Sequence, residues 1–334
     1  MTSNTLTETA ANNETLNFEN ARAAQSLYVN DPQNLRKIED RFGVKITTRD
    51  GWIKLDGSPD SIAKARDVFQ QLHLAREKGL YIRKTEFNFA LESVAKGTET
   101  KLPDLHAARI QISAKKPPII PKSLHQKKYV EAVKNHDLIF GVGPAGTGKT
   151  FLAMAMAVAA LKNEEVTRIV LTRPAVEAGG ALGFLPGDLQ EKIFPYLRPL
   201  YDALNDMLEN EEIQRYMDKG IIEIAPLAYM RGRTLSRSFI ILDEAQNTTT
   251  EQMFMFLTRL GQDSKCVITG DPSQVDLPHN RKSGLIEALQ ALHGTEGINF
   301  TKFDEVDVIR HELVQKIIRA YKAHRGEKTT SLTL

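Results

Sequence analysis

The sequence of 334 residues lacks several features that would place it in a specialised class of protein. It has one cysteine, Cys266, which excludes an internal disulfide and favours a reducing compartment. No apolar run approaches the ~20 residues that a membrane-spanning helix needs. The N-terminus has neither the basic start nor the apolar segment of a signal peptide. We therefore expect a cytoplasmic protein with no membrane association.

A large excess of charge of one sign is also lacking. The formal net charge is +2, so the composition argues neither for nor against nucleic acid, and any basic surface must be local. Hydrophobic residues make up 41% and charged residues 26%, which is ordinary for a globular chain. A chain of this length can form one large domain and a smaller one.

The sequence does contain a phosphate-binding motif. Residues 143–150 read GPAGTGKT and match the pattern G-x-x-x-x-G-K-[ST]. The apolar run 138–142 before it predicts a buried strand, and the Ala-rich run 151–161 after it predicts a helix. Backbone N–H groups of such a loop converge on a triphosphate, and the helix N-terminus adds partial positive charge. The residues expected to bind the nucleotide are Gly143, Pro144, Ala145, Gly146, Thr147, Gly148, Lys149 and Thr150.

Two carboxylates follow a second predicted strand, 239–242, and complete a candidate hydrolytic site. Lys149 is expected to meet the β- and γ-phosphates, while Thr150 and Asp243 are expected to hold Mg²⁺. Glu244 is expected to polarise the attacking water. Taken alone, the acidic pair would also suit a strand that ends in an acidic loop.

Gln274 is the last predicted member of this site. It follows the predicted strand 265–269 and a Gly-Asp turn, so its amide could contact the γ-phosphate or the attacking water. A plain polar turn is the alternative. Arg173 ends another predicted strand, before the glycine-rich loop 178–183. It could donate to the phosphates of a nucleic-acid backbone or form a surface salt bridge.

Strands and helices alternate beyond the phosphate loop, which predicts an α/β fold: a parallel sheet covered by helices on both faces. Pro195 and Pro199 are expected to kink or divide the helix predicted over 188–208. The N-terminal part follows the order β-α-α-β-β-α. The predicted segments are a disordered tail at 1–13, a small α+β domain at 14–90, a linker at 91–121, the α/β domain at 122–325 and a tail at 326–334.

The N-terminal order of elements resembles a KH RNA-binding module. That family clamps the nucleotide backbone with a GXXG loop between its first two helices, whereas residues 30–33 here read NDPQ. The residues leave two functions open for this domain, which are RNA binding and docking of another protein.

Three motifs in order, GPAGTGKT, DEAQ at 243–246 and GDPSQ at 270–274, resemble the core of superfamily 1 helicases. The phrases TRPAVEAG at 172–179, MRGRT at 230–234 and VIRH at 308–311 resemble the PhoH-like family. This resemblance implies a RecA-like P-loop NTPase core that hydrolyses ATP with Mg²⁺ in association with RNA. It further implies helicase activity, a hexameric ring, and cooperation with an rRNA-processing endoribonuclease or another ribosome-related partner.

The helicase resemblance also implies that Gln126, upstream of the phosphate loop, reads the adenine base. Two activities remain open: an ATPase that remodels RNA, and a nucleotide-dependent switch that recruits an endoribonuclease without unwinding. The chain has a single phosphate loop, so an arginine that neutralises γ-phosphate charge must come from a local loop or a neighbouring subunit. The candidates are Arg231, Arg233 and Arg310, and a surface salt bridge is the alternative for each.

Overall fold

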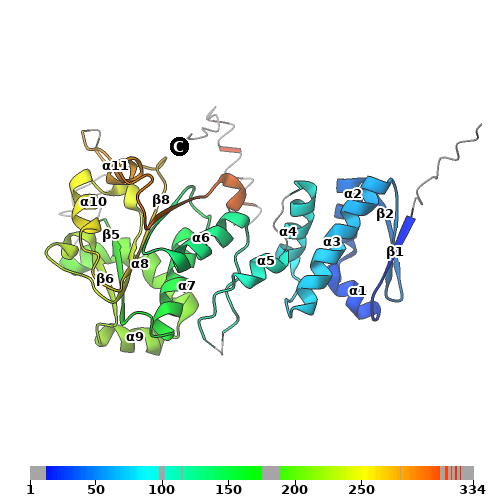
Figure 1. The fold of residues 1–334 in the computed structure, drawn as a ribbon, viewed down its shortest axis with the longest axis horizontal. Helices are drawn as coiled ribbons and strands as arrows, with labels where there is room; N and C mark the ends of the chain where they lie inside the picture. Colours follow the sequence, from blue (N-terminus) through cyan, green and yellow to red (C-terminus); the bar gives the residue numbers. More distant parts are fainter. Residues whose placement is uncertain are drawn as a thin grey trace, which may run out of the picture. The chain divides into compact units, whose positions relative to one another are not determined.

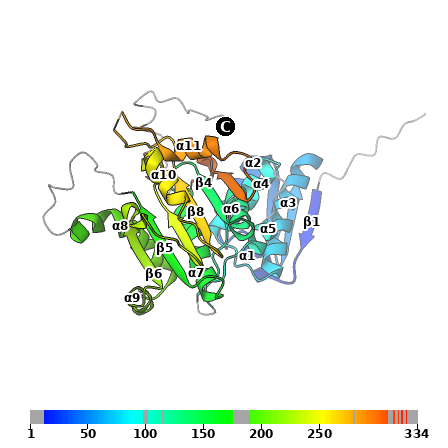
Figure 2. The ribbon, with the colours of Figure 1, turned by 60° about the vertical axis from the view of Figure 1, so that its left-hand side comes forward.

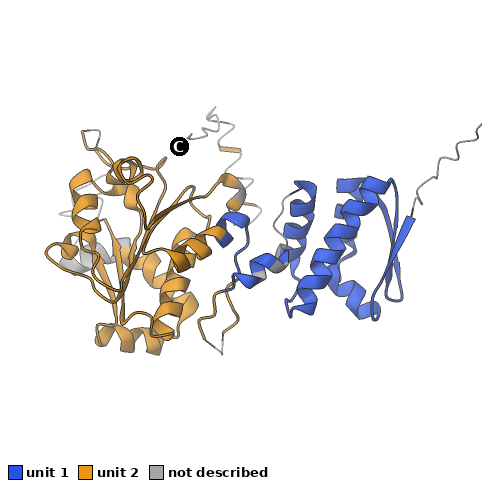
Figure 3. Cartoon of the chain, in the orientation of Figure 1, with its two compact units in different colours: residues 1–109, 120–127 blue, residues 110–119, 128–334 orange. Residues whose placement is uncertain are grey.

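The computed structural model describes residues 13–97, 102–113, 116–174, 189–278 and 280–308, with 313, 314, 317, 320, 321 and 324. The chain forms two compact units, residues 1–109 with 120–127, and residues 110–119 with 128–334 (Figure 3). Within the described ranges, every helix is too short or too polar to cross a bilayer.

The first unit combines helices with a three-stranded antiparallel sheet of order β1-β3-β2 (Figure 1). Its elements are β1 (Asn13–Asn17), α1 (Ala21–Leu27), α2 (Pro32–Phe42), β2 (Lys45–Arg49), β3 (Trp52–Asp56), α3 (Pro59–Glu77), α4 (Lys84–Ala95) and α5 (Leu102–Ala107). The first six follow the predicted order β-α-α-β-β-α. Of the predicted tails, 1–12 and 326–334 lie outside the described residues, whereas Asn13 begins β1.

Helices occupy part of the segment predicted as a linker. Both α4 and α5 contact α3, and Phe87, Ala90 and Leu102 are buried in the same core as α3. The structure therefore differs from a linker over 91–121, because residues 91–95 and 102–107 are helical. The apolar pattern of these short helices is weak, so their stability comes from packing against α3 rather than from local sequence.

The loop between α1 and α2 uses its carboxylate to cap a helix. Asp31 accepts a hydrogen bond from the backbone N–H of Gln33 at 3.0 Å, and Pro32 opens α2. Lys84 of α4 lies 3.5 Å from the same carboxylate. The carboxylate of this loop is therefore engaged in capping α2 and in an ion pair with Lys84.

The second unit contains a six-stranded sheet of order β6-β5-β7-β8-β4-β9, in which every pairing is parallel (Figure 2). Its strands are β4 (Leu138–Val142), β5 (Arg168–Arg173), β6 (Ile222–Pro226), β7 (Ser238–Leu242), β8 (Lys265–Gly270) and β9 (Ile298–Lys302). The helices are α6 (Leu124–Asn135, which begins in the first unit), α7 (Lys149–Lys162), α8 (Leu189–Met207), α9 (Asn210–Asp218), α10 (Thr250–Leu257) and α11 (Gly284–Ala291), with 3₁₀ turns η2 (Leu227–Met230), η3 (Ala245–Asn247) and η4 (Glu305–Asp307).

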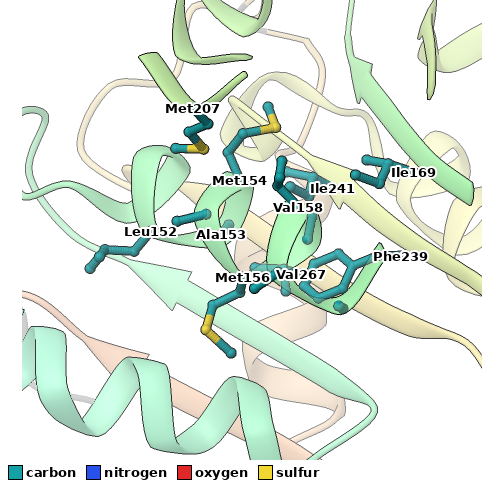
Figure 4. Close-up of a cluster of buried hydrophobic side chains, with 14 of the residues drawn as sticks. Leu152, Ala153, Met154, Met156, Val158, Ile169, Met207, Phe239, Ile241 and Val267 are labelled. Atoms are coloured by element: carbon teal, nitrogen blue, oxygen red, sulfur yellow. The ribbon is translucent and has the colours of Figure 1, made fainter. Parts of the chain in front are cut away.

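Both faces of this sheet are buried, as predicted for a parallel sheet. Alternate strand residues point to opposite faces. Ile169 and Ile241 pack with helices α6 to α9, while Val170 and Ile240 pack with η2, α10 and α11. Figure 4 shows the first cluster, where Met154 and other side chains of α7 lie against the strands. The predicted α/β fold with helices on both faces is confirmed.

Prolines do not divide α8, which runs uninterrupted through Pro195 and Pro199. The sequence predicts a kink or a division, because each proline removes a backbone donor. The prediction of a division is wrong, and a kink stays a prediction. The residues that follow hold the helix to the sheet, since Leu197, Leu200 and Leu204 are all buried in the core. Tertiary packing thus outweighs the local preference.

Candidate active site

The phosphate loop has the backbone conformation that its glycines allow. Gly143, Gly146 and Gly148 have φ angles of +141°, +84° and +84°, a region that other residues rarely adopt. A Cβ atom on Gly143 would lie 2.3 Å from the backbone oxygen of Phe303. The loop therefore requires glycine here for close approach as well as for backbone angle.

Lys149 opens α7 and turns its ammonium back across the loop. Its Nζ donates hydrogen bonds to the carbonyl oxygens of Gly143 at 2.6 Å and Pro144 at 2.7 Å, and to Thr147 Oγ1 at 3.3 Å. Only 8% of the residue is exposed. The loop and the first turn of α7 thus gather a buried cation beside backbone N–H groups, which suits an anionic ligand.

The electrostatics of the site combine this cation with three carboxylates. Burial lowers the pKa of Lys149, while the negative charges of Asp271, Asp243 and Glu244 act in the opposite direction. Even with Arg173 beside Glu244, three carboxylates outnumber the two cations, Lys149 and Arg173. A divalent cation bound among them would offset that excess.

Asp243 is the centre of a hydroxyl network. Its Oδ1 accepts hydrogen bonds from Thr150 Oγ1 and from Thr269 Oγ1, both at 2.7 Å. Only 7% of Asp243 is exposed. The structure therefore brings together Thr150 and Asp243, the two predicted metal ligands. Sequence reasoning missed Thr269, although a hydroxyl at the end of an otherwise apolar strand was a signal.

This donor set fits magnesium. Mg²⁺ typically takes one or two protein oxygens and completes its coordination with water and substrate phosphates. The hydroxyl of Thr150 and the carboxylate of Asp243 could supply those protein oxygens. Among the described residues there is no group of three or more His, Cys, Asp or Glu that would bind a metal on its own.

Glu244 is held by two neighbours. Its backbone is left-handed, with φ of +54°. Its Oε1 lies 3.3 Å from Nη2 of Arg173, and its Oε2 accepts a hydrogen bond of 2.5 Å from Gln246 Nε2. The Gln246 amide is oriented, because its Oε1 accepts from the backbone N–H of Asp271 at 3.1 Å. Sequence reasoning foresaw a salt bridge of Arg173 as one alternative and missed the role of Gln246.

A cavity of about 240 Å³ joins these elements. It is lined by the phosphate loop, Asp243, Glu244, Asp271 and Gln274. Gln274 is exposed, so its amide is available to a ligand. A larger hollow of about 640 Å³ is lined by residues of α9 and by Lys219, and it contains none of the predicted site residues.

The candidate arginines differ from one another. Arg233 forms a two-pronged ion pair with Glu223, with N–O distances of 2.6 and 2.7 Å. These hydrogen bonds lower the pKa of Glu223 and raise that of Arg233. Such a salt bridge was the alternative to a catalytic role. Arg231 is exposed, and Arg310 lies outside the described residues.

Gln126 belongs to the first unit and is buried. Its Oε1 accepts a hydrogen bond of 2.7 Å from the backbone N–H of Lys122. Its predicted contact with adenine stays a prediction. The glycine-rich loop 178–183 lies outside the described residues.

The chain is similar to known proteins over most of its length. The family model for the PhoH-like protein matches residues 118–322. A PhoH-like protein of Bacillus subtilis is 50% identical over 91% of this chain and 95% of its own length. A PhoH-like protein of Synechocystis is 43% identical over 95% of this chain and 96% of its own length. Protein PhoH of Escherichia coli is 44% identical over 61% of this chain and 58% of its own length. Among solved structures, a Sulfolobus solfataricus SWI2/SNF2 ATPase core in complex with dsDNA aligns with 44% of this chain and 31% of its own chain, at 15% sequence identity. The TM-score of 0.30 is too low for this likeness to bear on function. The family model and the similar sequences match most of the chain, so this protein belongs to the PhoH-like family.

Proposed function

We propose that this protein is an ATPase that acts on RNA, as a helicase or remodelling enzyme in the processing of rRNA or other RNA. One observation carries the hydrolytic part of the proposal. Lys149, Thr150, Asp243 and Glu244 come from two distant stretches of sequence and line a single cavity. Their side chains provide a cation, a hydroxyl and two carboxylates, which are the groups that phosphoryl transfer to water requires.

Each residue would do one task in that reaction. Lys149 would bind phosphate oxygens in place of the loop carbonyls of Gly143 and Pro144, which it contacts now. Thr150 and Asp243 would hold Mg²⁺, which neutralises phosphate charge when bound. Glu244 would accept a hydrogen bond from the attacking water and so orient it for in-line displacement.

Association with RNA rests on a different support. The N-terminal unit has the element order of a KH module, and the family resemblance implies RNA. Arg173 sits partly exposed at the carboxyl end of β5, where a guanidinium could meet backbone phosphates. A cytoplasmic location fits such a substrate.

A second candidate function is a nucleotide-dependent switch that recruits an endoribonuclease without unwinding RNA. The contact between Gln246 and the backbone of Asp271 favours it. Through this contact, a change at Glu244 would reach the turn that carries Gln274. Hydrolysis could then alter the surface around that turn.

We also propose a hexameric ring, in which a neighbouring subunit supplies the arginine that neutralises γ-phosphate charge. Arg231 is exposed, whereas Arg233 is tied to Glu223. Arg231 is therefore the better placed of the two to reach a neighbouring subunit. Light scattering tests the assembly directly.

The experiment that separates the two functions measures ATP hydrolysis with and without single-stranded RNA at fixed salt, followed by strand displacement on a partial duplex. Stimulation by RNA with displacement supports the remodelling enzyme. Hydrolysis that is indifferent to RNA, without displacement, supports the switch. A wild-type protein that does not hydrolyse ATP refutes both.

A further inference from the structure

The ion pair between Arg173 and Glu244 joins two neighbouring strands at the carboxyl end of the sheet, where the site lies. Arg173 is the last residue of β5, and Glu244 lies two positions beyond the end of β7. These strands pair in parallel, with Thr172 opposite Leu242. The side chains of Arg173 and Glu244 are 21% and 38% exposed, so solvent and ligands can reach both.

This ion pair involves Glu244, the carboxylate expected to polarise the attacking water. One carboxylate oxygen of Glu244 faces Arg173, and the other accepts from Gln246. With Arg173 and Gln246 in these positions, each oxygen of Glu244 already has a partner, so neither is fully available to a water molecule.

A second arginine in the same unit forms a shorter, two-pronged pair. Arg233 and Glu223 interact through two short contacts of 2.6 and 2.7 Å. The distance between Arg173 and Glu244 is 3.3 Å, beyond the 2.7–2.9 Å (roughly) of a strong charge-assisted hydrogen bond. The contact of Arg173 with Glu244 is thus the longer of the two, and another anion could compete with Glu244 for the guanidinium.

We propose that Arg173 is a positioning residue that restrains Glu244, and that backbone phosphates of single-stranded RNA compete for Arg173 and release Glu244 to act on water. The guanidinium group suits this exchange because it binds carboxylate and phosphate oxygens with the same planar fork. The inference rests on the proposed function, since it names the means by which RNA would accelerate hydrolysis.

The first test compares ATP hydrolysis by wild type, Arg173→Ala and Arg173→Lys, with and without single-stranded RNA. Without RNA, Arg173→Ala should hydrolyse ATP about threefold to tenfold faster than wild type, a gain of roughly 0.6 to 1.4 kcal/mol at 1.36 kcal/mol per factor of ten. RNA should add little to that rate. Arg173→Lys keeps the charge without the fork and should fall between the two.

A matched control is Arg215→Ala, which removes an arginine paired with Glu212 at 3.7 Å on α9, outside the site. It should keep both the basal rate and the stimulation of wild type. Fluorescent nucleotide binding and the thermal midpoint of each variant report whether the site still folds. An Arg173→Ala protein that binds nucleotide but hydrolyses more slowly than wild type overturns the proposal, because Arg173 would then orient Glu244 productively.

The second test needs no hydrolysis. If Glu244 competes with RNA for Arg173, neutralising Glu244 should tighten RNA binding. Glu244→Gln should bind single-stranded RNA about threefold to tenfold more tightly than wild type, and one additional phosphate contact should steepen the salt dependence. The gain should vanish in the double variant Arg173→Ala with Glu244→Gln. An equal gain in that background would mean that Glu244 merely repels RNA, and the proposal would fail.

The two proposals fail in different ways. If RNA neither binds wild type nor alters its ATP hydrolysis, the RNA function is wrong, whatever Arg173→Ala does. If RNA stimulates wild type and Arg173→Ala to the same degree from the same basal rate, the RNA function stands and the role of Arg173 is wrong.

Discussion

Replacing Lys149 with methionine tests whether this buried lysine serves the ligand or the fold. The variant keeps most of the side-chain length and removes the ammonium that donates to Gly143 and Pro144. Loss of one preorganised donor from a site of developing charge typically lowers turnover by about 10²–10³-fold. Hydrolysis of ATP by Lys149→Met should therefore fall at least that far, with a large loss of triphosphate affinity.

Stability should respond differently. Burial lowers the pKa of Lys149 from 10.5 despite the nearby carboxylates, so the charged side chain costs folding free energy. That cost is fully present below the folded-state pKa, and it is relieved as pH rises from there to the unfolded value. Each tenfold change in the protonation equilibrium corresponds to about 1.4 kcal/mol. At neutral pH Lys149→Met should be as stable as wild type or more stable, and this advantage should shrink at alkaline pH.

The assay pairs steady-state hydrolysis with denaturant unfolding at neutral and alkaline pH. Lys265→Met is the matched control, because burial also lowers the pKa of Lys265, which starts β8 at the opposite end of the strand from the site. It should show the same pH trend in stability with normal hydrolysis. Near-normal hydrolysis by Lys149→Met would refute the site. Loss of folding by Lys149→Met at neutral pH would show that its hydrogen bonds outweigh burial.

Four further predictions concern other parts of the chain. Glu244→Gln should bind fluorescent ATP with near-normal affinity and fail to hydrolyse it, and loss of binding would show that Glu244 does not act on water. Gly143→Ala should lower the free energy of unfolding by about 2 kcal/mol or more and weaken ATP binding, because its Cβ would lie 2.3 Å from the backbone oxygen of Phe303; unchanged unfolding and binding would contradict the loop geometry. Removing residues 1–109 should preserve ATP hydrolysis and reduce RNA affinity, whereas a folded but inactive remainder would assign the first unit to catalysis. Mixing subunits that carry Arg231→Ala with Lys149→Ala subunits should restore activity if Arg231 acts across an interface, and a fully active monomer would exclude that.

The strands and the phosphate loop could be predicted because local sequence determines them. The sequence predicts strands at 138–142 and 265–269 and a strand that ends at Arg173. The structure places β4, β8 and β5 there, with each compared boundary within a residue. These runs are apolar and buried on both sides, so their pattern survives without tertiary information. The glycine positions of the loop follow from the φ angles that the turn demands.

Helices held mainly by tertiary contacts were harder to predict. The short helix α5 has a weak apolar pattern, and its burial against α3 depends on residues more than twenty positions away. Pro195 and Pro199 suggested an interruption that the packing of α8 overrides. In both cases the deciding interaction is not encoded in a local window of sequence.

Within the site, too, some residues could be predicted from the local sequence, whereas their contacts depend on the fold. Motif spacing predicted Asp243 and Glu244, but a linear pattern does not reveal which neighbour each carboxylate contacts. Arg173 reaches Glu244 only because β5 lies beside β7 in the sheet. Thr269 reaches Asp243 only because β8 lies on the other side of β7.

That strand order also sets the sequence of charges along the edge of the sheet. Arg173 comes from β5, Asp243 and Glu244 follow β7, Asp271 follows β8, and the loop with Lys149 follows β4, and these four strands are consecutive in the sheet. The two cations therefore stand on opposite sides of the carboxylates. An anion bound at Arg173 and a triphosphate bound at Lys149 would each lie near a carboxylate whose like charge repels it. Glu244 contacts Arg173 and also lines the cavity with Lys149, so the proposed exchange of Glu244 for a phosphate at Arg173 would act directly on the nucleotide site.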